Sequence, residues 1–289
     1  MLGIIVLNYN TYEKSIGCIN SIINTINIKY RIYLVDNCSP NGSYNILKET
    51  FDGNDNVITI KSNSNLGYAK GNNLGIESAL EDNCEVLLIT NNDIIYHEKT
   101  IDVLYKEMKA RDAFITAPKV FELDGSIQRS IKFTHPSYEQ YLFEETSFSK
   151  LHKQLNFKPN SETCQVYWVA GCCFMVDSKK FSRIGFFDNN TFLFYEEYIL
   201  AKKAERYKYE LYYIPNVDVL HFHGSSVGKL NIVAYIACAN SEKYYILNYT
   251  NWGKLRSGFI LFLRKMDVVL RFGRAKKWDC VRQYLKSID

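Results

Sequence analysis

The sequence predicts an α/β fold with a Rossmann-like, mostly parallel sheet flanked by helices, and three observations support this prediction. Four short apolar runs alternate with amphipathic stretches over the first hundred residues. Within each run the apolar residues are continuous, which is typical of strands that are covered on both faces. Polar residues follow every run, at the end of the strand where open α/β sheets bind their ligands.

The first hundred residues contain the clearest elements. The apolar runs predict four strands, at 3–10, 31–37, 56–62 and 86–93. The stretches between them predict three helices, at 12–25, 45–51 and 68–81, the last of them after its glycines. The turn-forming residues 39–43, Ser-Pro-Asn-Gly-Ser, open the second helix.

Beyond residue 100 the pattern loosens. Residues 113–121 predict another strand, and 124–163 are polar and irregular. A strand followed by a helix is predicted for 166–181, a helix with an acidic start for 192–209, and a pair of strands for 210–224. The remaining residues predict a helical tail.

Composition limits the class of protein. With 289 residues, 47% of them hydrophobic, the chain suits one large α/β domain with an appendage. The eight cysteines show no C-x-x-C and no His/Cys ligand spacing, which favours reduced thiols of a cytosolic protein. The N-terminus lacks the features of a signal peptide. No run reaches the ~20 apolar residues that span a bilayer, so we do not expect an integral membrane protein.

Charge is unevenly distributed along the chain. The net charge is +4, but residues 253–289 hold ten Lys and Arg against three Asp. The rest of the chain is therefore slightly acidic. Because basicity belongs to the tail alone, the sequence argues against a nucleic-acid-binding protein.

A nucleotide is the expected ligand of the crevice, but the common phosphate-binding loops are missing. No G-x-G-x-x-G follows the first strand, and no G-x-x-x-x-G-K-[ST] occurs in the chain. The glycines that do cluster, Gly67, Gly71 and Gly75, follow the third strand. A glycine cluster at this place differs in geometry from either of these phosphate-binding loops.

Three strand-end residues each allow two interpretations. Asp36 could accept hydrogen bonds from a base or a ribose hydroxyl, or it could cap the next helix together with Ser39. Tyr9 could stack on a base or serve in packing. Asp93, which follows two asparagines, could hold Mg²⁺ on a diphosphate, or it could cap the helix that follows.

Two further groups also allow a structural and a functional interpretation, although a lone histidine on a strand is usually structural. Glu196 and Glu197 could be acidic residues of a helix's first turn, or one of them could be a general base in an aromatic-lined cleft. His221 and His223 alternate along a strand, so only one of them can face the cleft.

Seven segments resemble, in order and approximate spacing, those of the family 2 glycosyltransferases with a GT-A fold, especially the bacterial rhamnosyltransferase-like branch. The segments are IIVLNYN, YLVDNCSPNGS, NLGYAKGNNLGI, VLLITNND, WVAGCCFMV, IGFFDNNTFLFYEEYIL and HFHGSSVGK. The resemblance implies a catalytic domain over 1–230, with a nucleotide-sugar-binding half at 1–100 and an acceptor half at 101–230. Residues 231–289 would form a basic amphipathic helical extension.

On the donor side, the resemblance implies a divalent cation, Mg²⁺ or Mn²⁺. Asp93 occupies the place of the family's DXD-type metal motif and would ligate the cation on the donor diphosphate. His221 would help to hold the metal or the diphosphate. The other residues that would bind the nucleotide-sugar are Asn8, Tyr9, Asn10, Asp36, Lys70 and Asn92.

On the acceptor side, the resemblance implies that Glu197 is the catalytic base, with Glu196 as the acidic residue before it. Trp168 to Gly171 would form the acceptor-side wall. The chain departs from the family pattern at two positions, because a Glu replaces the usual Asp as base and Ile199 replaces a second Asp.

The function implied is inverting transfer of a sugar from a nucleoside-diphosphate sugar, a UDP- or dTDP-sugar, to a hydroxyl of a growing bacterial surface glycan such as capsule or O-antigen. The glycan acceptor could be lipid-linked. Two alternatives remain open. A sugar nucleotidyltransferase would need a Gly-rich basic loop after the first strand, and a non-catalytic nucleotide-sugar-binding protein could use the same fold.

The tail has two interpretations of its own. Its apolar residues recur at helical spacing, at Leu255, Phe259, Phe262, Met266 and Val269. Its charge comes from Arg264, Lys265, Arg271, Arg274, Lys276 and Lys277. The tail could pack on the catalytic domain with a solvated basic face, or it could dock on an anionic membrane surface. The second interpretation predicts a cytoplasmic protein that is peripheral on the inner face of the cell membrane.

Overall fold

One large sheet organises the N-terminal part of the protein, whose computed structural model describes residues 1–145, 161–222 and 231–288. Its first half is fully parallel, in the order β3 (Val57–Lys61), β2 (Tyr30–Asp36), β1 (Leu2–Asn8) and β4 (Val86–Asn91). The order continues with β10 (Cys173–Asp177), β6 (Ile115–Glu122), β11 (Leu211–His221) and β5 (Ile94–Tyr96), and β8 (Cys164–Val166) pairs with β11. Because only β10, β5 and β8 run antiparallel to their neighbours, the predicted mostly parallel sheet is confirmed.

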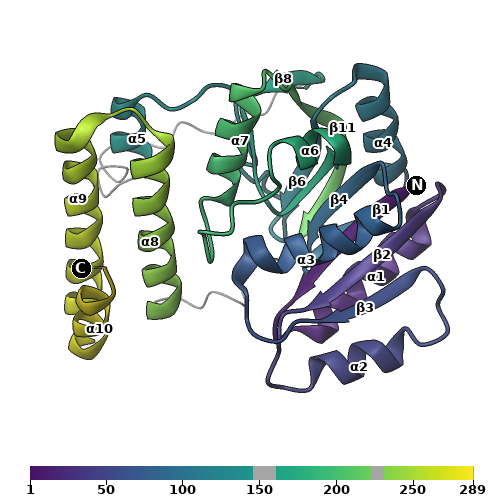
Figure 1. The fold of residues 1–289 in the computed structure, drawn as a ribbon, viewed down its shortest axis with the longest axis horizontal. Helices are drawn as coiled ribbons and strands as arrows, with labels where there is room; N and C mark the ends of the chain where they lie inside the picture. Colours follow the sequence, from purple (N-terminus) through teal and green to yellow (C-terminus); the bar gives the residue numbers. More distant parts are fainter. Residues whose placement is uncertain (146–160, 223–230, 289) are drawn as a thin grey trace.

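Helices cover both faces of this sheet (Figure 1). One face is covered by α1 (Tyr12–Thr25), α2 (Ser43–Thr50) and α4 (Thr100–Arg111). The other is covered by α3 (Gly67–Glu81), α6 (Ser178–Arg183) and α7 (Glu196–Arg206). Side chains alternate along each strand, so neighbouring apolar residues enter different cores.

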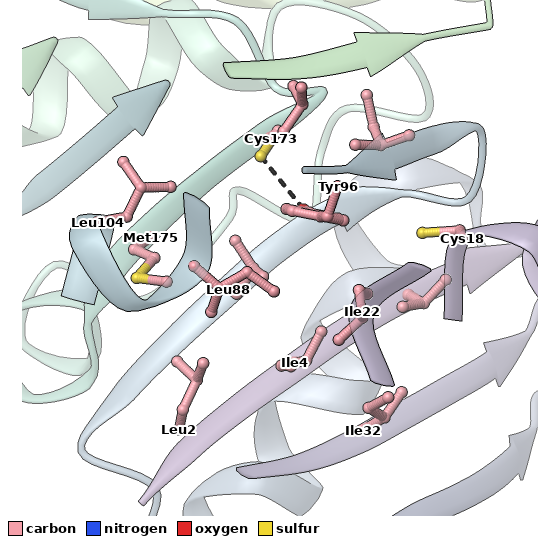
Figure 2. Close-up of a cluster of buried hydrophobic side chains, with 14 of the residues drawn as sticks. Leu2, Ile4, Cys18, Ile22, Ile32, Leu88, Tyr96, Leu104, Cys173 and Met175 are labelled. Carbon is pink, nitrogen blue, oxygen red and sulfur yellow. Dashed lines mark hydrogen bonds between the residues drawn. The ribbon is translucent and has the colours of Figure 1, made fainter. Parts of the chain in front are cut away.

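The first core shows how this alternation works. Ile4 of β1 and Leu88 of β4 pack with Ile22 of α1 and Leu104 of α4, as Figure 2 shows. Ile5, the next residue along β1, belongs to the cluster on the other face. Continuous apolar runs therefore supply both faces of the sheet at once, which is why the strands could be predicted from them.

The glycines of α3 have a steric role. A Cβ on Gly71 would lie 2.7 Å from Leu7 Cδ1, and one on Gly75 would lie 2.8 Å from Ile5 Cγ2. These two glycines therefore let α3 lie close against β1. Gly67 has a φ of +77°, and a Cβ there would lie 2.2 Å from the carbonyl oxygen of Phe192. Only glycine fits where α3 begins.

The structure differs from the sequence prediction at several elements. The predicted strand pair at 210–224 is wrong, because Leu211–His221 is one strand with a register shift between Ile214 and Asp218. Pro215 lies in this interval, and a proline cannot donate to the ladder. Within the polar region 124–163, the described residues contain two short elements, β7 (Ile131–Lys132) and α5 (Tyr138–Glu145). β7 pairs with β9 (Trp168–Val169) in a separate two-stranded sheet.

The C-terminal residues form a helical lobe beside the sheet domain, drawn in yellow-green in Figure 1. It consists of α8 (Ile232–Tyr249), α9 (Gly253–Arg274) and α10 (Trp278–Ile288). One cluster, which includes Val268, Phe272 and Tyr284, holds the three helices together. Among the described residues, no helix is long and apolar enough to cross a membrane.

A second cluster joins this lobe to the sheet domain. Ile246 of α8 and Ile260 of α9 pack with Tyr141 of α5 and with Tyr195 and Tyr198 at the start of α7. The lobe thus reaches the helix that carries the two predicted catalytic carboxylates. Packing on the catalytic domain, the first of the two interpretations of the tail, is therefore present in the structure.

Candidate active site

The carboxyl ends of β1, β2 and β4 are joined by one buried polar network. Asn8 Nδ2 donates to Asp36 Oδ1 at 2.7 Å, and Asn8 Oδ1 accepts from Ser15 Oγ at 2.9 Å. Asn92 Nδ2 donates to the same Ser15 Oγ at 2.8 Å. Asn8 and Asp36 have no exposed surface. Asn8 therefore shapes the edge of the sheet, but its side chain cannot contact a ligand directly in this conformation, contrary to the direct lining role expected from the sequence.

Asp36 also fixes the turn that follows β2. Its carboxylate accepts from the Ser39 amide at 3.0 Å and from Ser39 Oγ at 2.6 Å. The interpretation as a helix cap is wrong, because α2 begins at Ser43, and Gly42 is its N-cap residue. Contact between Asp36 and a base requires this turn to move.

Three of the predicted donor-binding residues are open to solvent. Tyr9 is 40% exposed directly after β1. Asn10, in a left-handed conformation with φ 62°, is exposed next to it. Lys70 is exposed near the start of α3. These side chains can meet a nucleotide without displacing protein contacts.

Asp93 lies between two basic side chains. His221 Nε2 is 3.2 Å from Asp93 Oδ1, and Lys14 Nζ is 3.4 Å from Oδ2. Burial alone would raise the pKa of Asp93, but His221 and Lys14 together hold that pKa below its ordinary value. The helix-cap interpretation of Asp93 is wrong, because β5 follows at once and α4 begins only at Thr100. Asp93 is therefore a mostly buried carboxylate beyond the end of β4, 14% exposed and flanked by two basic groups.

Asp93 and His221 fit the protein's share of a divalent cation site. His221 Nδ1 lies 3.0 Å from Gln128 Oε1. The contact with Gln128 orients the ring so that His221 Nε2 faces Asp93, and a second polar partner that orients the ring is typical of a metal-ligating histidine. Within 1–145, 161–222 and 231–288, no group of three His, Cys, Asp or Glu could hold a metal. The pair therefore suits a cation that takes its other oxygens from a diphosphate and water. His223 lies outside the described residues.

The two glutamates occupy the first turn of α7, where they differ in hydrogen bonding. Glu197 Oε1 accepts from the Gly171 amide at 3.2 Å. Glu196 is buried, and its Oε2 has no hydrogen-bond partner among the described residues. Burial raises the pKa of Glu197, and burial together with the charge of Glu197 raises the pKa of Glu196 well above its ordinary value. Two carboxylates with raised pKa values in a crevice are typical of acid–base sites.

The backbone that presents these glutamates is strained. Phe194 and Tyr195 have φ of 69° and 68°, a left-handed region that bulky side chains rarely adopt. Each such residue costs on the order of 1–3 kcal/mol and persists only where its surroundings hold it. Strain of this kind is characteristic of functional sites.

Short main-chain links connect the two acidic centres. The amide of Asn91, at the end of β4, donates to the Cys172 carbonyl at 2.8 Å. The neighbouring residue, Gly171, is the one that contacts Glu197. Glu197 and the strand end before Asp93 are therefore separated by the Gly171-Cys172 dipeptide alone.

Tyr68 is a site residue that the sequence analysis missed. Its hydroxyl donates to the Gly171 carbonyl at 2.6 Å, and its amide donates to the Phe192 carbonyl at 2.7 Å. The helix α3 thus ties Gly171 to the loop before Glu197. The sequence signal that could have identified Tyr68 is its position directly after Gly67 in the GYAKGNN segment.

Aromatic side chains surround Trp168, which the sequence predicts to lie on the acceptor side. The ring centroids of Trp168 and Tyr198 are 5.6 Å apart, and Trp168 Nε1 is buried without a partner among the described residues. Ile199, which replaces an Asp of the family pattern, is 1% exposed in the cluster shared with the C-terminal lobe. A carboxylate there would be buried in apolar surroundings, so the lobe accounts for this departure.

A mostly parallel sheet flanked by helices, with polar residues at its strand ends and helices at the C-terminus, is a GT-A-like fold. The chain belongs to glycosyl transferase family 2, whose family model matches residues 3–185. Glu196, Glu197 and His221 lie beyond the matched residues.

Relatives of known function are modestly similar. A low-salt glycan biosynthesis hexosyltransferase, Agl10, of Haloferax volcanii is 27% identical over 224 residues, which is 76% of this chain and 66% of that protein. The N-acetylglucosaminyl-diphospho-decaprenol L-rhamnosyltransferase of Mycobacterium tuberculosis is 22% identical over 240 residues, 76% of each chain. The chain therefore spans about two thirds to three quarters of the length of these relatives.

Solved structures share the fold. GalNAc-T7 with UDP, GalNAc and Mn²⁺ superposes with a TM-score of 0.64 at 14% identity, over 85% of this chain and 47% of that one. Residues 1–349 of TarS from S. aureus, in complex with UDP-GlcNAc, superpose with a TM-score of 0.59 at 14% identity, over 100% of this chain and 81% of that one. These likenesses confirm the fold class.

Proposed function

We propose that this protein is a metal-dependent, inverting glycosyltransferase that transfers a sugar from a UDP- or dTDP-sugar to a hydroxyl of a growing bacterial surface glycan. One observation carries the proposal. The Gly171-Cys172 dipeptide connects Glu197, whose pKa is raised, to Asn91, and Asn91 lies two residues before Asp93, which contacts His221. A base and a cation site at one crevice are what this reaction requires.

Glu197 acts as the general base. It takes the proton from the acceptor hydroxyl, whose oxygen attacks the anomeric carbon on the face opposite the diphosphate, and the bond from that carbon to the diphosphate oxygen breaks. The Gly171 amide holds one carboxylate oxygen, which leaves Oε2 to accept the proton. Glu196 places a second, buried acidic side chain next to the base. Trp168 and Gly171 border the acceptor.

Asp93 and His221 would hold Mg²⁺ or Mn²⁺, and the bound cation neutralises charge on the leaving nucleoside diphosphate. Lys14, in contact with Asp93, adds a positive charge at the same position. Tyr9, Asn10 and Lys70 contact the nucleotide from the exposed side of the crevice. Asn92 and the buried pair Asn8–Asp36 fix the strand ends beneath it. The acceptor and donor residues thus lie on the two sides of one crevice.

A non-catalytic binding protein is the second candidate, and the Glu in place of Asp at the base position favours it. A sugar nucleotidyltransferase would use a Gly-rich loop after β1, where Asn8-Tyr9-Asn10 stands instead. Nucleoside diphosphate release separates the three functions. We expect purified protein with Mn²⁺ to release UDP or dTDP from one member of a UDP-, dTDP- and GDP-sugar panel. Binding without release would favour the second candidate, and pyrophosphate formation the third.

The protein is proposed to act in the cytoplasm at the inner face of the cell membrane, where a lipid-linked glycan acceptor would be available. The support is an apolar stripe on the outer side of α9, whose residues are each at least 38% exposed: Leu255, Phe259, Phe262, Met266 and Leu270. Exposed Arg256, Arg274, Lys276 and Lys277 lie on the same helix or just beyond it. An apolar stripe with cations beside it suits an anionic lipid surface.

Sequence alone misjudged part of this stripe. The sequence predicts that Arg264 belongs to the basic face of the tail. In the structure, Arg264 lies on the inner side of α9 and pairs with the fully buried Glu242 of α8. Leu270, which was omitted, belongs to the exposed stripe, and Val269 is half-buried. Substitutions in this stripe therefore test membrane binding more sharply than removal of the tail does, because removal would also expose the aromatic cluster.

Sedimentation with vesicles provides that test. We expect the unaltered protein to bind phosphatidylglycerol-containing vesicles at low salt and to be released as salt rises. Phe262→Ser with Leu255→Ser should abolish binding without lowering the melting temperature. Tyr207→Ser, at a residue 51% exposed on the sheet domain, is the matched control and should bind normally. Equal binding by all three proteins would exclude α9 as the docking surface.

A further inference from the structure

The loop that leads to the catalytic glutamates is held by the C-terminal lobe. Ser241 Oγ on α8 donates to the Leu193 carbonyl at 3.0 Å. Tyr244 OH, also on α8, donates to Asp188 Oδ2 at 3.0 Å, and Tyr249 OH contacts the same oxygen. A helix outside the residues matched by the family model thus fixes the loop at two points.

A chain of hydrogen bonds continues from this lobe to the strained turn. Arg264 Nη2 on α9 donates to Glu242 Oε1 at 3.0 Å, and Tyr141 OH donates to the same oxygen at 2.8 Å. The Tyr141 hydroxyl is 2.6 Å from the Tyr195 hydroxyl. Tyr195 is the N-cap residue of α7 and directly precedes Glu196.

This chain is buried except at Arg264, whose side chain is 20% exposed. Glu242 and Tyr141 have no exposed surface, and Tyr195 is 7% exposed. A buried ion pair is weak evidence for a stabilising role, because apolar residues of similar volume often serve as well. Hydrogen bonds, by contrast, fix direction, and Tyr195 adopts a conformation that its own backbone disfavours. The chain ends on the residue that directly precedes the two glutamates and caps their helix.

We propose that Tyr141, Glu242 and Arg264 are positioning residues that hold Tyr195 in its left-handed conformation and so aim Glu197 at the acceptor. The inference rests on the proposed role of Glu197 as the base. It makes the C-terminal lobe part of the catalytic apparatus. The donor side, built on β1, β2 and β4, does not depend on it.

Steady-state kinetics of the full chain tests this assignment, with the UDP- or dTDP-sugar that gives most nucleoside diphosphate release as the probe. Tyr141→Phe should lower kcat about tenfold or more, as expected when a catalytic group is displaced, while KM for the donor stays unchanged. The acid limb of the kcat–pH profile should also shift, because the surroundings of Glu197 change. Tyr195→Phe leaves the Tyr141–Glu242 bond intact and should show the same pattern if Tyr141→Phe does not fold.

Phe272→Leu is the matched control, because Phe272 is fully buried in the lobe cluster away from Tyr195. It should lower the melting temperature without changing kcat or its acid limb. If Tyr141→Phe and Tyr195→Phe keep normal kcat and pH profiles while Glu197→Gln loses turnover, the positioning role is excluded. If Glu197→Gln itself keeps full turnover, the proposed function fails instead.

Discussion

The two sides of the crevice are built in opposite ways. On the donor side, Asn8, Asp36 and Asn92 satisfy one another at the ends of three strands that the core already fixes. On the acceptor side, Glu196 has a buried oxygen without a partner among the described residues, and the turn before it is strained at Phe194 and Tyr195. One side is held from within the sheet, whereas the other is held by a helical lobe.

This difference indicates how the protein divides its tasks. A sheet edge whose polar side chains are hydrogen-bonded to one another is rigid before any ligand arrives. Such rigidity suits recognition of a constant nucleotide group. Burial raises the pKa of both glutamates, which suits a carboxylate that accepts and releases protons. Changes on the donor side should therefore remove binding, and changes on the acceptor side should remove turnover while binding persists.

The largest effect is expected at Asp93. Asp93→Ala removes the carboxylate on which the proposed cation depends, and metal stabilisation of the leaving group is worth several kcal/mol. Transfer should fall by roughly a thousandfold or more, since each 1.4 kcal/mol is about a factor of ten. Calorimetry of UDP and dTDP binding with and without Mn²⁺ should show that the Mn²⁺-dependent gain in affinity is lost.

Asp102→Ala serves as the control for this change. Asp102 accepts hydrogen bonds from Asn27 on the far side of α1 and has no contact with the crevice residues. It should keep the Mn²⁺ effect. An Asp93→Ala protein that retained the same Mn²⁺ dependence as the unaltered chain would contradict the metal assignment.

Glu197→Gln should separate the two sides most clearly. Donor affinity should be unchanged, while kcat falls by about 10²–10⁴-fold, the usual contribution of a general base. Because burial raises the pKa of Glu197, activity in the unaltered protein should be lost as pH falls through a value above 4.5. That acid limb should be absent from the residual activity of the variant. A larger loss of kcat in Glu196→Gln would instead make Glu196 the base.

The strands and the polar residues at their carboxyl ends could be predicted from sequence, whereas the burial of Asn8 and Asp36 and the contacts of Glu197 could not. Asp93 follows β4, which ends at Asn91, and its place at the carboxyl end of a buried strand follows from the local pattern. The contacts of Glu197 depend on Gly171 and Tyr68, which are 26 residues before it and on another helix respectively. Such contacts arise only when distant elements pack. The inward orientation of the Arg264 side chain could not be predicted either, because helical spacing does not indicate which neighbouring element covers a face of the helix.

Gly171→Ala should displace the base without removing it. A Cβ at this position would lie 2.8 Å from Glu197 Oε1, so the carboxylate must move. A displacement of about 1 Å can cost on the order of a hundredfold in rate, and we expect kcat to fall by about ten- to a hundredfold. Gly258→Ala is the control, because a Cβ there meets nothing within 4 Å. Normal kcat in Gly171→Ala would show that the acceptor side tolerates displacement.

The smallest effect is expected in stability, where two buried glutamates should respond with opposite signs. The folded protein raises the pKa of Glu196, so folding favours its protonated form, and stability is lost as pH rises from about 4.5 through that raised value. Glu196→Gln removes this penalty and should raise the melting temperature at pH 8 by a few degrees, since about 1.4 kcal/mol accompanies each tenfold change in protonation. The gain should vanish at pH 4.5.

Glu242→Gln should lower the melting temperature, because Glu242 is paired and Arg264 would lose its charged partner. Calorimetric melting of both variants at the two pH values measures this contrast. A Glu196→Gln protein that was less stable at pH 8 would show that the Glu196 carboxylate is stabilised in the fold, and the two sides of the crevice would then not differ in the way described.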